Sequence, residues 1–207
     1  ARAFEDPSVA HTEGSVDPFR DVETMEYELV FSDLNILERR LGRVEEQFKG
    51  AKAPEREALN REQALLGRLK EALEAGTPIR DQSLQQDERR LMSGFQLLTA
   101  KPLIVVANVG ENRLPESAAT EQRLSSQLAG SGVQATALCG KLEMELAQMD
   151  PEEERQFRES MNAGESGAGK IIRISYNLLG LDSFFTVGPD EVKAWTVTKS
   201  EPASLAA

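Results

Sequence analysis

The chain has 207 residues, of which 40% are hydrophobic and 29% are charged, and its formal net charge is −11. This length can bury a core and hold one or two domains, whereas the acidic balance argues against a general nucleic-acid or membrane-surface binder, which needs a positive field. A single cysteine, Cys139, excludes an internal disulfide framework and fits a reducing compartment. We therefore expect a cytoplasmic protein with no DNA and no membrane partner.

The first long element should be helical. Asp17 followed by Pro18 is a typical N-cap and first-turn pair. Apolar residues then recur at heptad spacing on both sides of the Gly- and Pro-containing segment 49–54: Leu37, Leu41, Val44 and Phe48, then Leu59, Leu66, Leu69 and Leu73. Two such seams joined by a short loop predict an antiparallel helical hairpin of coiled-coil type, whose charged outer faces project into solvent.

A short helix is expected over Leu91–Leu98, followed by the most informative stretch of the chain. Five apolar residues, Leu103–Ala107, lie between Pro102 and Asn108-x-x-Glu111. A run that is apolar on both faces is typical of a central strand in a parallel sheet covered by helices. Ligands bind beyond the carboxyl ends of such strands, so we expect Asn108 and Glu111 to lie at a ligand site.

In nucleotide triphosphatases, an amide and a carboxylate at this position read the edge of the base. An Asn amide both donates and accepts hydrogen bonds, whereas an ionised acid only accepts. The alternative is structural, because many α/β proteins end a buried strand with Asn and a turn.

The remaining elements alternate between helix and strand. Val133–Leu138 is a second, weaker strand that ends in Cys139-Gly140. Helices are expected over 117–129, 142–149, 151–162 and 170–179. Phe184–Val187 and Lys193–Val197 should form two further strands, which belong to another domain because two strands alone are marginally stable.

Gly164–Lys170 matches most of the phosphate-binding loop pattern, G-x-x-x-x-G-K-[ST]. That loop requires a preceding strand and a Ser or Thr directly after the Lys to bind Mg²⁺. Here the next residue is Ile171, and the preceding segment has the pattern of a charged helix. We interpret this segment as a helix–helix connection. His11, the single histidine, is interpreted as structural because no Ser or Cys partner stands at a recognisable spacing.

Several motifs, taken in this order, resemble one family. They are Arg2-Ala3-Phe4-Glu5-Asp6, then His11-Thr12-Glu13-Gly14-Ser15-Val16-Asp17-Pro18, then Leu98–Pro102 leading into Asn108-x-x-Glu111, and finally Phe184-Phe185-Thr186-Val187 and Ala194-Trp195-Thr196. Together they resemble the YchF / Obg-like ATPases, from the segment after the second phosphate-sensing motif to the start of the TGS domain. The resemblance covers most of the chain.

The resemblance implies an α/β fold. It would comprise the second half of a P-loop NTPase sheet domain of the TRAFAC type, an inserted antiparallel α-helical coiled-coil hairpin, and the start of a TGS β-domain. In these terms, residues 1–30 and 97–182 form the partial NTPase domain, 31–96 the hairpin and 183–207 the start of the TGS domain. Both ends of the chain, including the Ala-rich segment 204–207, are expected to be cut from a longer protein.

The resemblance also implies ligands and partners. The family's usual Asn-Lys-x-Asp motif is altered to Asn-x-x-Glu, which relaxes guanine selection, so the nucleotide would be ATP, with GTP possible. By position, Asn108, Val109 and Glu111 would line the base. Cys139 and Gly140, where the family usually has Ser-Ala, would contact the base through the backbone. Mg²⁺ and a ribosome or ribosomal subunit are implied too, but the phosphate-binding loop and the Mg²⁺ ligands would precede Ala1.

Three functions follow from these observations. The first is the base-recognition half of a ribosome-associated Obg-like ATPase, inactive in hydrolysis by itself because phosphoryl transfer depends on positioning the phosphates. The second is a non-enzymatic adaptor that acts through the helical hairpin. The third, the least favoured, is an independent ATPase that uses Gly164–Lys170.

Overall fold

The computed structural model describes residues 1–128, 130, 132–161 and 164–199. The end of the expected TGS segment, 200–207, lies outside the described residues. The chain divides into two compact units. The sheet unit contains Ala1–Pro18 and the described residues of 103–129 and 133–207, and the helix unit contains Phe19–Pro102 with Gly130 and Gly132. Within the described ranges, no helix combines the length and apolarity needed to cross a membrane.

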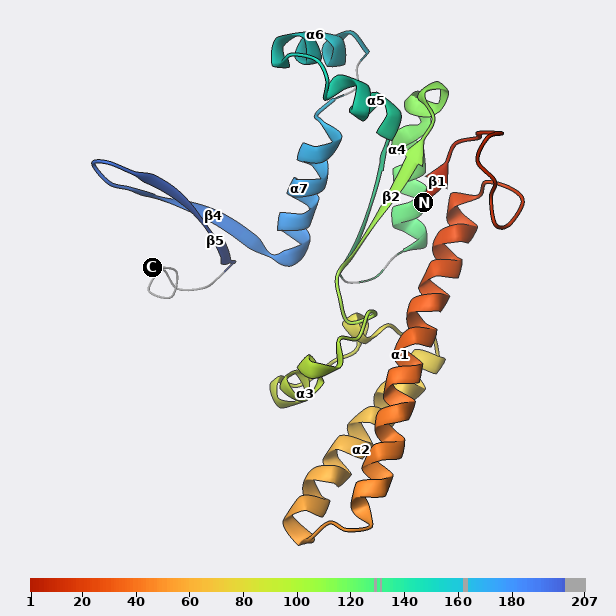
Figure 1. The fold of residues 1–207 in the computed structure, drawn as a ribbon, viewed down its shortest axis with the longest axis vertical. Helices are drawn as coiled ribbons and strands as arrows, with labels where there is room; N and C mark the ends of the chain where they lie inside the picture. The colour runs from red at the N-terminus through yellow and green to blue at the C-terminus, as the bar shows by residue number, and fades with distance from the viewer. Residues whose placement is uncertain (129, 131, 162–163, 200–207) are drawn as a thin grey trace. The chain divides into compact units, whose positions relative to one another are not determined.

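The sheet unit has an α/β fold built on three parallel strands. Their order is β1 (Arg2–Ala3), β2 (Leu103–Val109) and β3 (Val133–Leu138), so β2 is central (Figure 1). The prediction of a central strand from the apolar run is confirmed, and so are the bounds of β3. Strand β1 was not expected, because two residues show no periodicity and the segment has the composition of a loop.

The described part of the sheet unit contains four α-helices after β2. They are α4 (Ser117–Gln127), α5 (Gly140–Leu146), α6 (Pro151–Met161) and α7 (Gly167–Leu179). Helix α4 makes the crossover between β2 and β3, and its Leu124 is fully buried. The carboxylate of Glu121 on α4 accepts from the Thr136 hydroxyl at 3.1 Å and from Ala137 N at 3.2 Å, which fixes α4 against β3.

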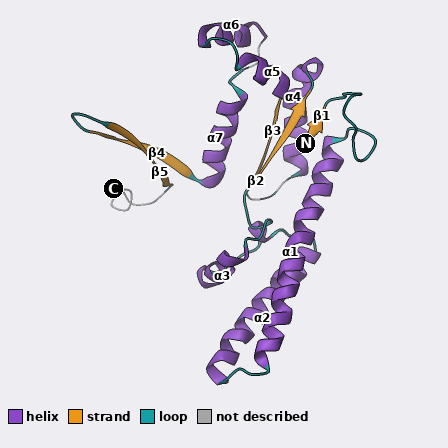
Figure 2. Ribbon diagram, viewed as in Figure 1, coloured by secondary structure: helices purple, strands orange, loops and turns teal. Residues whose placement is uncertain are grey.

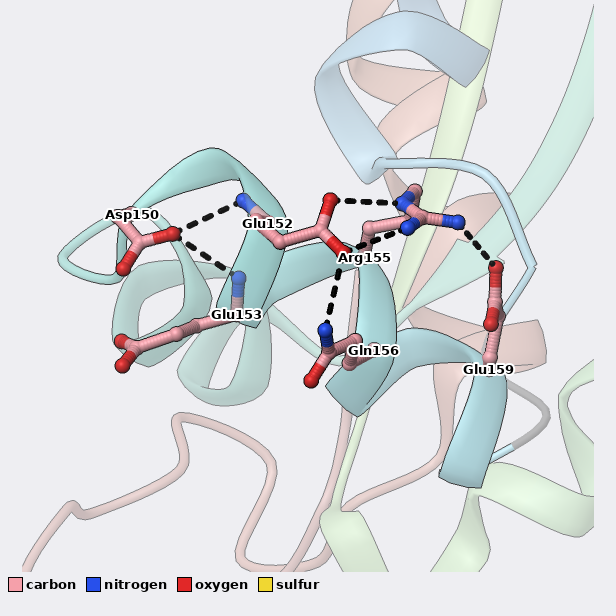
Figure 3. A network of polar contacts seen from close by, with 6 residues as sticks. All are labelled: Asp150, Glu152, Glu153, Arg155, Gln156 and Glu159. Atoms are coloured by element: carbon pink, nitrogen blue, oxygen red, sulfur yellow. Dashed lines mark hydrogen bonds and ion pairs between the residues drawn. The ribbon is translucent and has the colours of Figure 1, made fainter.

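Helix α6 carries a surface network of polar side chains (Figure 3). The Asp150 carboxylate accepts from the backbone N–H groups of Glu152 and Glu153, both at 3.0 Å, and so caps the helix. Arg155 binds Glu152 at 2.6 Å and Glu159 at 3.3 Å, one turn away on either side. These side chains are more than half exposed. The acidic start of α6 therefore serves the helix itself.

The last described element of the sheet unit is an antiparallel pair, β4 (Leu181–Val187) and β5 (Val192–Thr198). Both expected strands are confirmed, each with longer bounds. The indole N–H of Trp195 donates to the Thr186 hydroxyl at 2.9 Å across the pair.

The helix unit consists mainly of α1 (Pro18–Phe48) and α2 (Ala53–Glu74), joined by a four-residue loop (Figure 2). The residues of both predicted heptad seams lie in or against one apolar cluster, in which Leu37, Val44, Leu66, Leu69 and Leu73 are almost fully buried. Between the helices, Arg40 binds both carboxylate oxygens of Glu62, at 2.6 and 2.8 Å. We call these two helices the helix pair.

The segment after the helix pair differs from expectation. A helix was expected over Leu91–Leu98, but α3 (Gln86–Met92) ends earlier and passes into a 3-10 turn, Ser93–Phe95. Gln96 then has φ +55°. This left-handed backbone ends the helical path, because it directs the chain away from the helix axis.

Candidate functional site

A cleft of about 500 Å³ lies at the carboxyl ends of the three parallel strands. It is lined by the end of β2 and the turn after it, by Ala3 at the end of β1 with residues 4–6 beyond it, and by Cys139 and Lys141 beyond β3. Asn108 and Leu138 are paired in register, so the segments that follow β2 and β3 leave the sheet together. The parallel sheet thus places Asn108, Glu111 and Cys139 around one cleft, and the strand pattern had predicted this position for Asn108 and Glu111.

Asn108 is held by the segment after β3. Its side-chain Oδ1 accepts a hydrogen bond from the backbone N–H of Gly140 at 2.8 Å. A Cβ built at Gly140 would lie 3.2 Å from this oxygen, so a larger residue would crowd the amide. Because the oxygen is engaged, the orientation of the amide is fixed and its NH₂ group remains to donate to a ligand.

Glu111 begins a short 3-10 helix, Glu111–Glu116, and pairs with Lys141. The Lys141 ammonium lies 3.3 Å from the Glu111 carboxylate and 3.8 Å from that of Glu145. Its hydrogen bond to Glu111 raises the pKa of Lys141. The carboxylate that could accept from a ligand therefore already has a cationic partner at the mouth of the cleft.

Arg2 orders the loop that forms another wall. Its guanidinium donates to the backbone oxygens of Phe4 at 2.9 Å, Asp6 at 3.1 Å and Val9 at 2.9 Å. It also lies 5.0 Å from the centre of the Phe4 ring, within range of a cation–π contact. Hydrogen bonds from Ser8 lower the pKa of Asp6 in the same loop. One side chain thus converts a segment rich in turn residues into a defined wall.

The five proposed site residues are not equivalent. Asn108, Val109, Glu111 and Cys139 line the cleft, and Gly140 supports Asn108 from behind. Cys139 is buried, with 3% of its surface exposed. The sequence interpretation missed Arg2 and Lys141. For Lys141 a signal was present, since a lysine directly after Cys139-Gly140 has to lie close to the end of β3.

Gly164–Lys170 does not have the context of a phosphate-binding loop. Helix α6 precedes it, where the loop requires a strand, and α7 begins at Gly167, three residues before the expected start at Lys170, so the segment joins two helices and its second half is already helical. The backbone N–H of Gly167 donates to Glu143 at 2.9 Å, and the Lys170 ammonium binds Glu121 at 2.6 Å. Carboxylates of the chain itself thus occupy the groups that would hold a phosphate.

His11 lies in a turn, where its Nδ1 accepts from the backbone N–H of Glu13 at 3.2 Å. It is not among the described residues that line the cleft. Nor do the described ranges bring together three or more His, Cys, Asp or Glu side chains in a way that could hold a metal ion.

The chain resembles known proteins along almost its whole length. No protein-family model matches it. The chain is 37% identical over 204 residues to the ribosome-binding ATPase YchF of Bacillus subtilis, covering 98% of the chain and 55% of that protein. It is 34% identical over 209 residues to Obg-like ATPase 1 of Caenorhabditis elegans, covering the whole chain and 52% of that protein.

A solved structure, that of the Schizosaccharomyces pombe YchF GTPase, matches with a TM-score of 0.82 and 30% identity. The match covers 99% of this chain and 55% of that one. The chain therefore spans about half the length of the relatives that it matches.

Proposed function

This chain belongs to the YchF / Obg-like ATPase family, and from that premise we propose that it carries the base-recognition part of a ribosome-associated ATPase. The observation that supports the proposal is the cleft at the carboxyl ends of the strands, where the Asn108 amide is fixed beside the Glu111 carboxylate. The nucleotide would be ATP, with GTP as a weaker ligand, and the protein would work in the cytoplasm.

The chemistry of the two side chains fits base reading. The engaged Oδ1 of Asn108 leaves its NH₂ group to donate to a ring nitrogen or a carbonyl oxygen of the base. Glu111 offers a carboxylate that accepts N–H groups, but the Lys141 ammonium competes for it at 3.3 Å. Guanine presents two adjacent N–H donors and gains most from a free carboxylate, so the competition works against guanine more than against adenine.

Val109 would contact the base from β2, and Cys139 and Gly140 would contact it through the backbone. Phe4 would add an apolar wall, because the cation–π contact with Arg2 holds its ring beside the cleft.

The family implies Mg²⁺, but the described residues do not fit it. They include no cluster of three or more acidic, His or Cys side chains that could hold the ion. We therefore derive no phosphoryl-transfer step from these residues. Their proposed part is binding and orientation of the nucleoside.

The second part of the proposal concerns the helix pair. We propose that residues 31–96 are a coiled-coil arm that contacts the ribosome, and that β4 and β5 begin a TGS domain. Support for the arm comes from its construction, since a continuous apolar seam holds α1 and α2 together and leaves their charged faces exposed. The loop end of the arm carries Lys49, Lys52 and Arg56, against the net negative charge.

A non-enzymatic adaptor is the alternative, supported by the same self-contained helix pair. Reversing the three charges at the loop end, Lys49, Lys52 and Arg56, distinguishes the two. The ATPase proposal expects weaker ribosome binding with unchanged nucleotide affinity, whereas an adaptor has no nucleotide affinity to preserve.

Calorimetric titration of ATP and GTP, with adenosine and guanosine as probes of the base alone, tests the proposed function. We expect the adenine compounds to bind at least as tightly as the guanine compounds. Asn108→Ala should lower the affinity for all four compounds by about tenfold, since the variant loses the amide that would donate a hydrogen bond to the base. Failure of all four to bind at millimolar concentration would contradict the proposal.

A further inference from the structure

A second cavity, of about 440 Å³, is lined by residues of the helix unit. It is formed almost entirely by the segment 79–102, which follows the helix pair. Its size is within the range of small-molecule sites. Its lining combines an apolar side, with Ile79, Met92 and Leu97 each less than 8% exposed, and a polar side.

The charge of the polar side is of one sign. Arg80, Arg89 and Lys101 line the cavity, and none of its described lining residues is acidic. The chain as a whole carries a net charge of −11, so the positive charge of this lining is opposite in sign to the net charge of the chain. A concave wall of one sign concentrates the potential and attracts a ligand of the other sign.

Arg80 is the most buried of the three, and one of its nitrogens has no hydrogen-bond partner among the described residues. Its side chain is only 7% exposed, and its one carboxylate contact within the described part of the chain, to Glu26, is 3.5 Å long. One terminal nitrogen lies 3.5 Å from Thr99 O, and Nε has no hydrogen-bond partner among the described residues. Buried guanidinium groups are normally fully hydrogen-bonded, so Arg80 brings to the wall a positive charge and a donor that no described group satisfies.

The other two cations, Arg89 and Lys101, have few hydrogen-bond or ion-pair partners among the described residues. Arg89 uses its Nε to donate to Leu84 O at 3.1 Å, which orients the guanidinium and leaves its terminal nitrogens for other acceptors. The Lys101 side chain is exposed, and no described group forms an ion pair with it. Beside them, Gln96 is the one described non-glycine residue with a positive φ, +55°, and such backbone strain clusters at ligand sites.

We propose that this cavity binds a small organic anion, whose phosphate or carboxylate head group is held by Arg80, Arg89 and Lys101 and whose apolar body lies against Ile79, Met92 and Leu97. Arginine forks match the geometry of both head groups, and lysine adds a point charge. The site is separate from the cleft at Asn108, so it holds a second ligand and not the nucleotide base. The ligand needs both an anionic head group and an apolar body, because the cavity has both a cationic side and an apolar side.

The test uses phenyl phosphate, inorganic phosphate and phenol as probes, titrated into the whole chain at constant ionic strength and followed by amide NMR shifts. We expect saturable shifts at 79–82 and 96–101 with phenyl phosphate. Inorganic phosphate should bind more weakly, and phenol should not bind. Benzoate in place of phenyl phosphate shows whether the head group is a phosphate or a carboxylate, and binding of either supports the proposal.

Variants separate a built site from diffuse charge. Arg89→Ala together with Lys101→Ala should weaken phenyl phosphate binding by about tenfold or more, since charge-assisted hydrogen bonds are lost. Arg90→Ala, the control on α3, removes one positive charge from an exposed neighbour outside the lining, so it is matched to Arg89→Ala alone and should change the affinity less than twofold. Equal losses in the two variants, shifts at Asn108 instead, or the absence of saturable shifts would overturn the proposal.

Discussion

The side-chain oxygen of Asn108 and the backbone N–H of Gly140 are joined by a hydrogen bond of 2.8 Å between residues that lie 32 positions apart. It connects the ends of two parallel strands, β2 and β3, and gives the Asn108 amide one orientation. A residue proposed to read a base thus also holds its own site together, and substitutions at Asn108 must separate the two roles.

Asn108→Asp makes this separation. The carboxylate keeps an oxygen to accept from Gly140, so the stability should fall by less than about 1 kcal/mol, whereas Asn108→Ala should cost about 1–2 kcal/mol. Both variants lose the NH₂ donor, so both should lower the affinity for ATP by about tenfold. Urea denaturation and calorimetry measure the two effects. Full ATP affinity in Asn108→Asp would mean that the amide does not contact the base.

Lys141→Ala should change nucleotide preference more than affinity. Without the ammonium 3.3 Å away, the Glu111 carboxylate is free to accept both N–H donors of guanine. We expect the ratio of GTP to ATP affinity to rise by about threefold to tenfold. Lys141→Arg keeps the charge and is the control, with an unchanged ratio. If Lys141→Ala binds both nucleotides as before, Lys141 has no part in selectivity.

Lys170→Ala tests the dismissal of Gly164–Lys170 as a phosphate site. The change removes the 2.6 Å ion pair with Glu121 and should lower the free energy of unfolding by about 1 kcal/mol, because a partly buried carboxylate loses its cation. ATP affinity should not change. Arg173→Ala, on the same helix as Lys170, is the control for stability, because it removes an exposed ion pair with Glu165. Loss of ATP binding in Lys170→Ala alone would reinstate the phosphate-binding interpretation.

A partly buried ion network between α5 and α6 should make the stability depend on pH. Arg158 donates to both oxygens of Glu143, at 3.0 and 2.7 Å, and these hydrogen bonds lower the pKa of Glu143 below its ordinary value of 4.5. A carboxylate with a lowered pKa stabilises the fold above its ordinary value, and this contribution is lost as the pH falls through the folded value. The stabilisation should therefore be complete at pH 7 and decline below about pH 4.5.

Glu143→Gln should thus be less stable than the parent chain at pH 7, and the difference should narrow in acid. Urea denaturation at pH 7 and pH 4 measures it. Glu152→Gln is the control, since Glu152 also binds an arginine but in the exposed network of Figure 3. It should have little effect at either pH. A difference for Glu143→Gln that stays constant between the two pH values would contradict this account.

The parts of the structure that the sequence predicted are those with a local pattern. The apolar run from Leu103 located β2, and the heptad seams located the core of the helix pair. Because parallel strands end at one edge of a sheet, the same run located Asn108 and Glu111 at a cleft. The apolar run and the heptad seams therefore located β2, the helix pair and the place of Asn108 and Glu111, whereas the finer fold and the remaining site residues came from the family resemblance.

What escaped prediction depends on contacts between distant residues. Strand β1 exists only because β2 lies beside it, and the order of the 4–9 loop comes from Arg2 reaching three backbone oxygens. The helix expected over Leu91–Leu98 was misplaced, because its apolar residues fit a helical period while the left-handed Gln96 interrupts it. Contacts between residues far apart in the sequence leave no local sequence pattern from which they could be predicted.

Asp33 is a further case, and it provides the last prediction. This fully buried carboxylate on α1 accepts from Leu98 N at 2.8 Å and from the Thr99 N–H and hydroxyl at 2.7 and 2.6 Å. Asp33→Ala leaves these donors buried without an acceptor, so we expect a loss of about 3 kcal/mol in urea denaturation and faster hydrogen exchange at Thr99. Asp33→Asn keeps one acceptor oxygen and should lose less stability than Asp33→Ala. Glu38→Ala, at an exposed position of the same helix, is the control. If Asp33→Ala costs no more than Glu38→Ala, these hydrogen bonds do not hold the 97–99 segment to the helix pair.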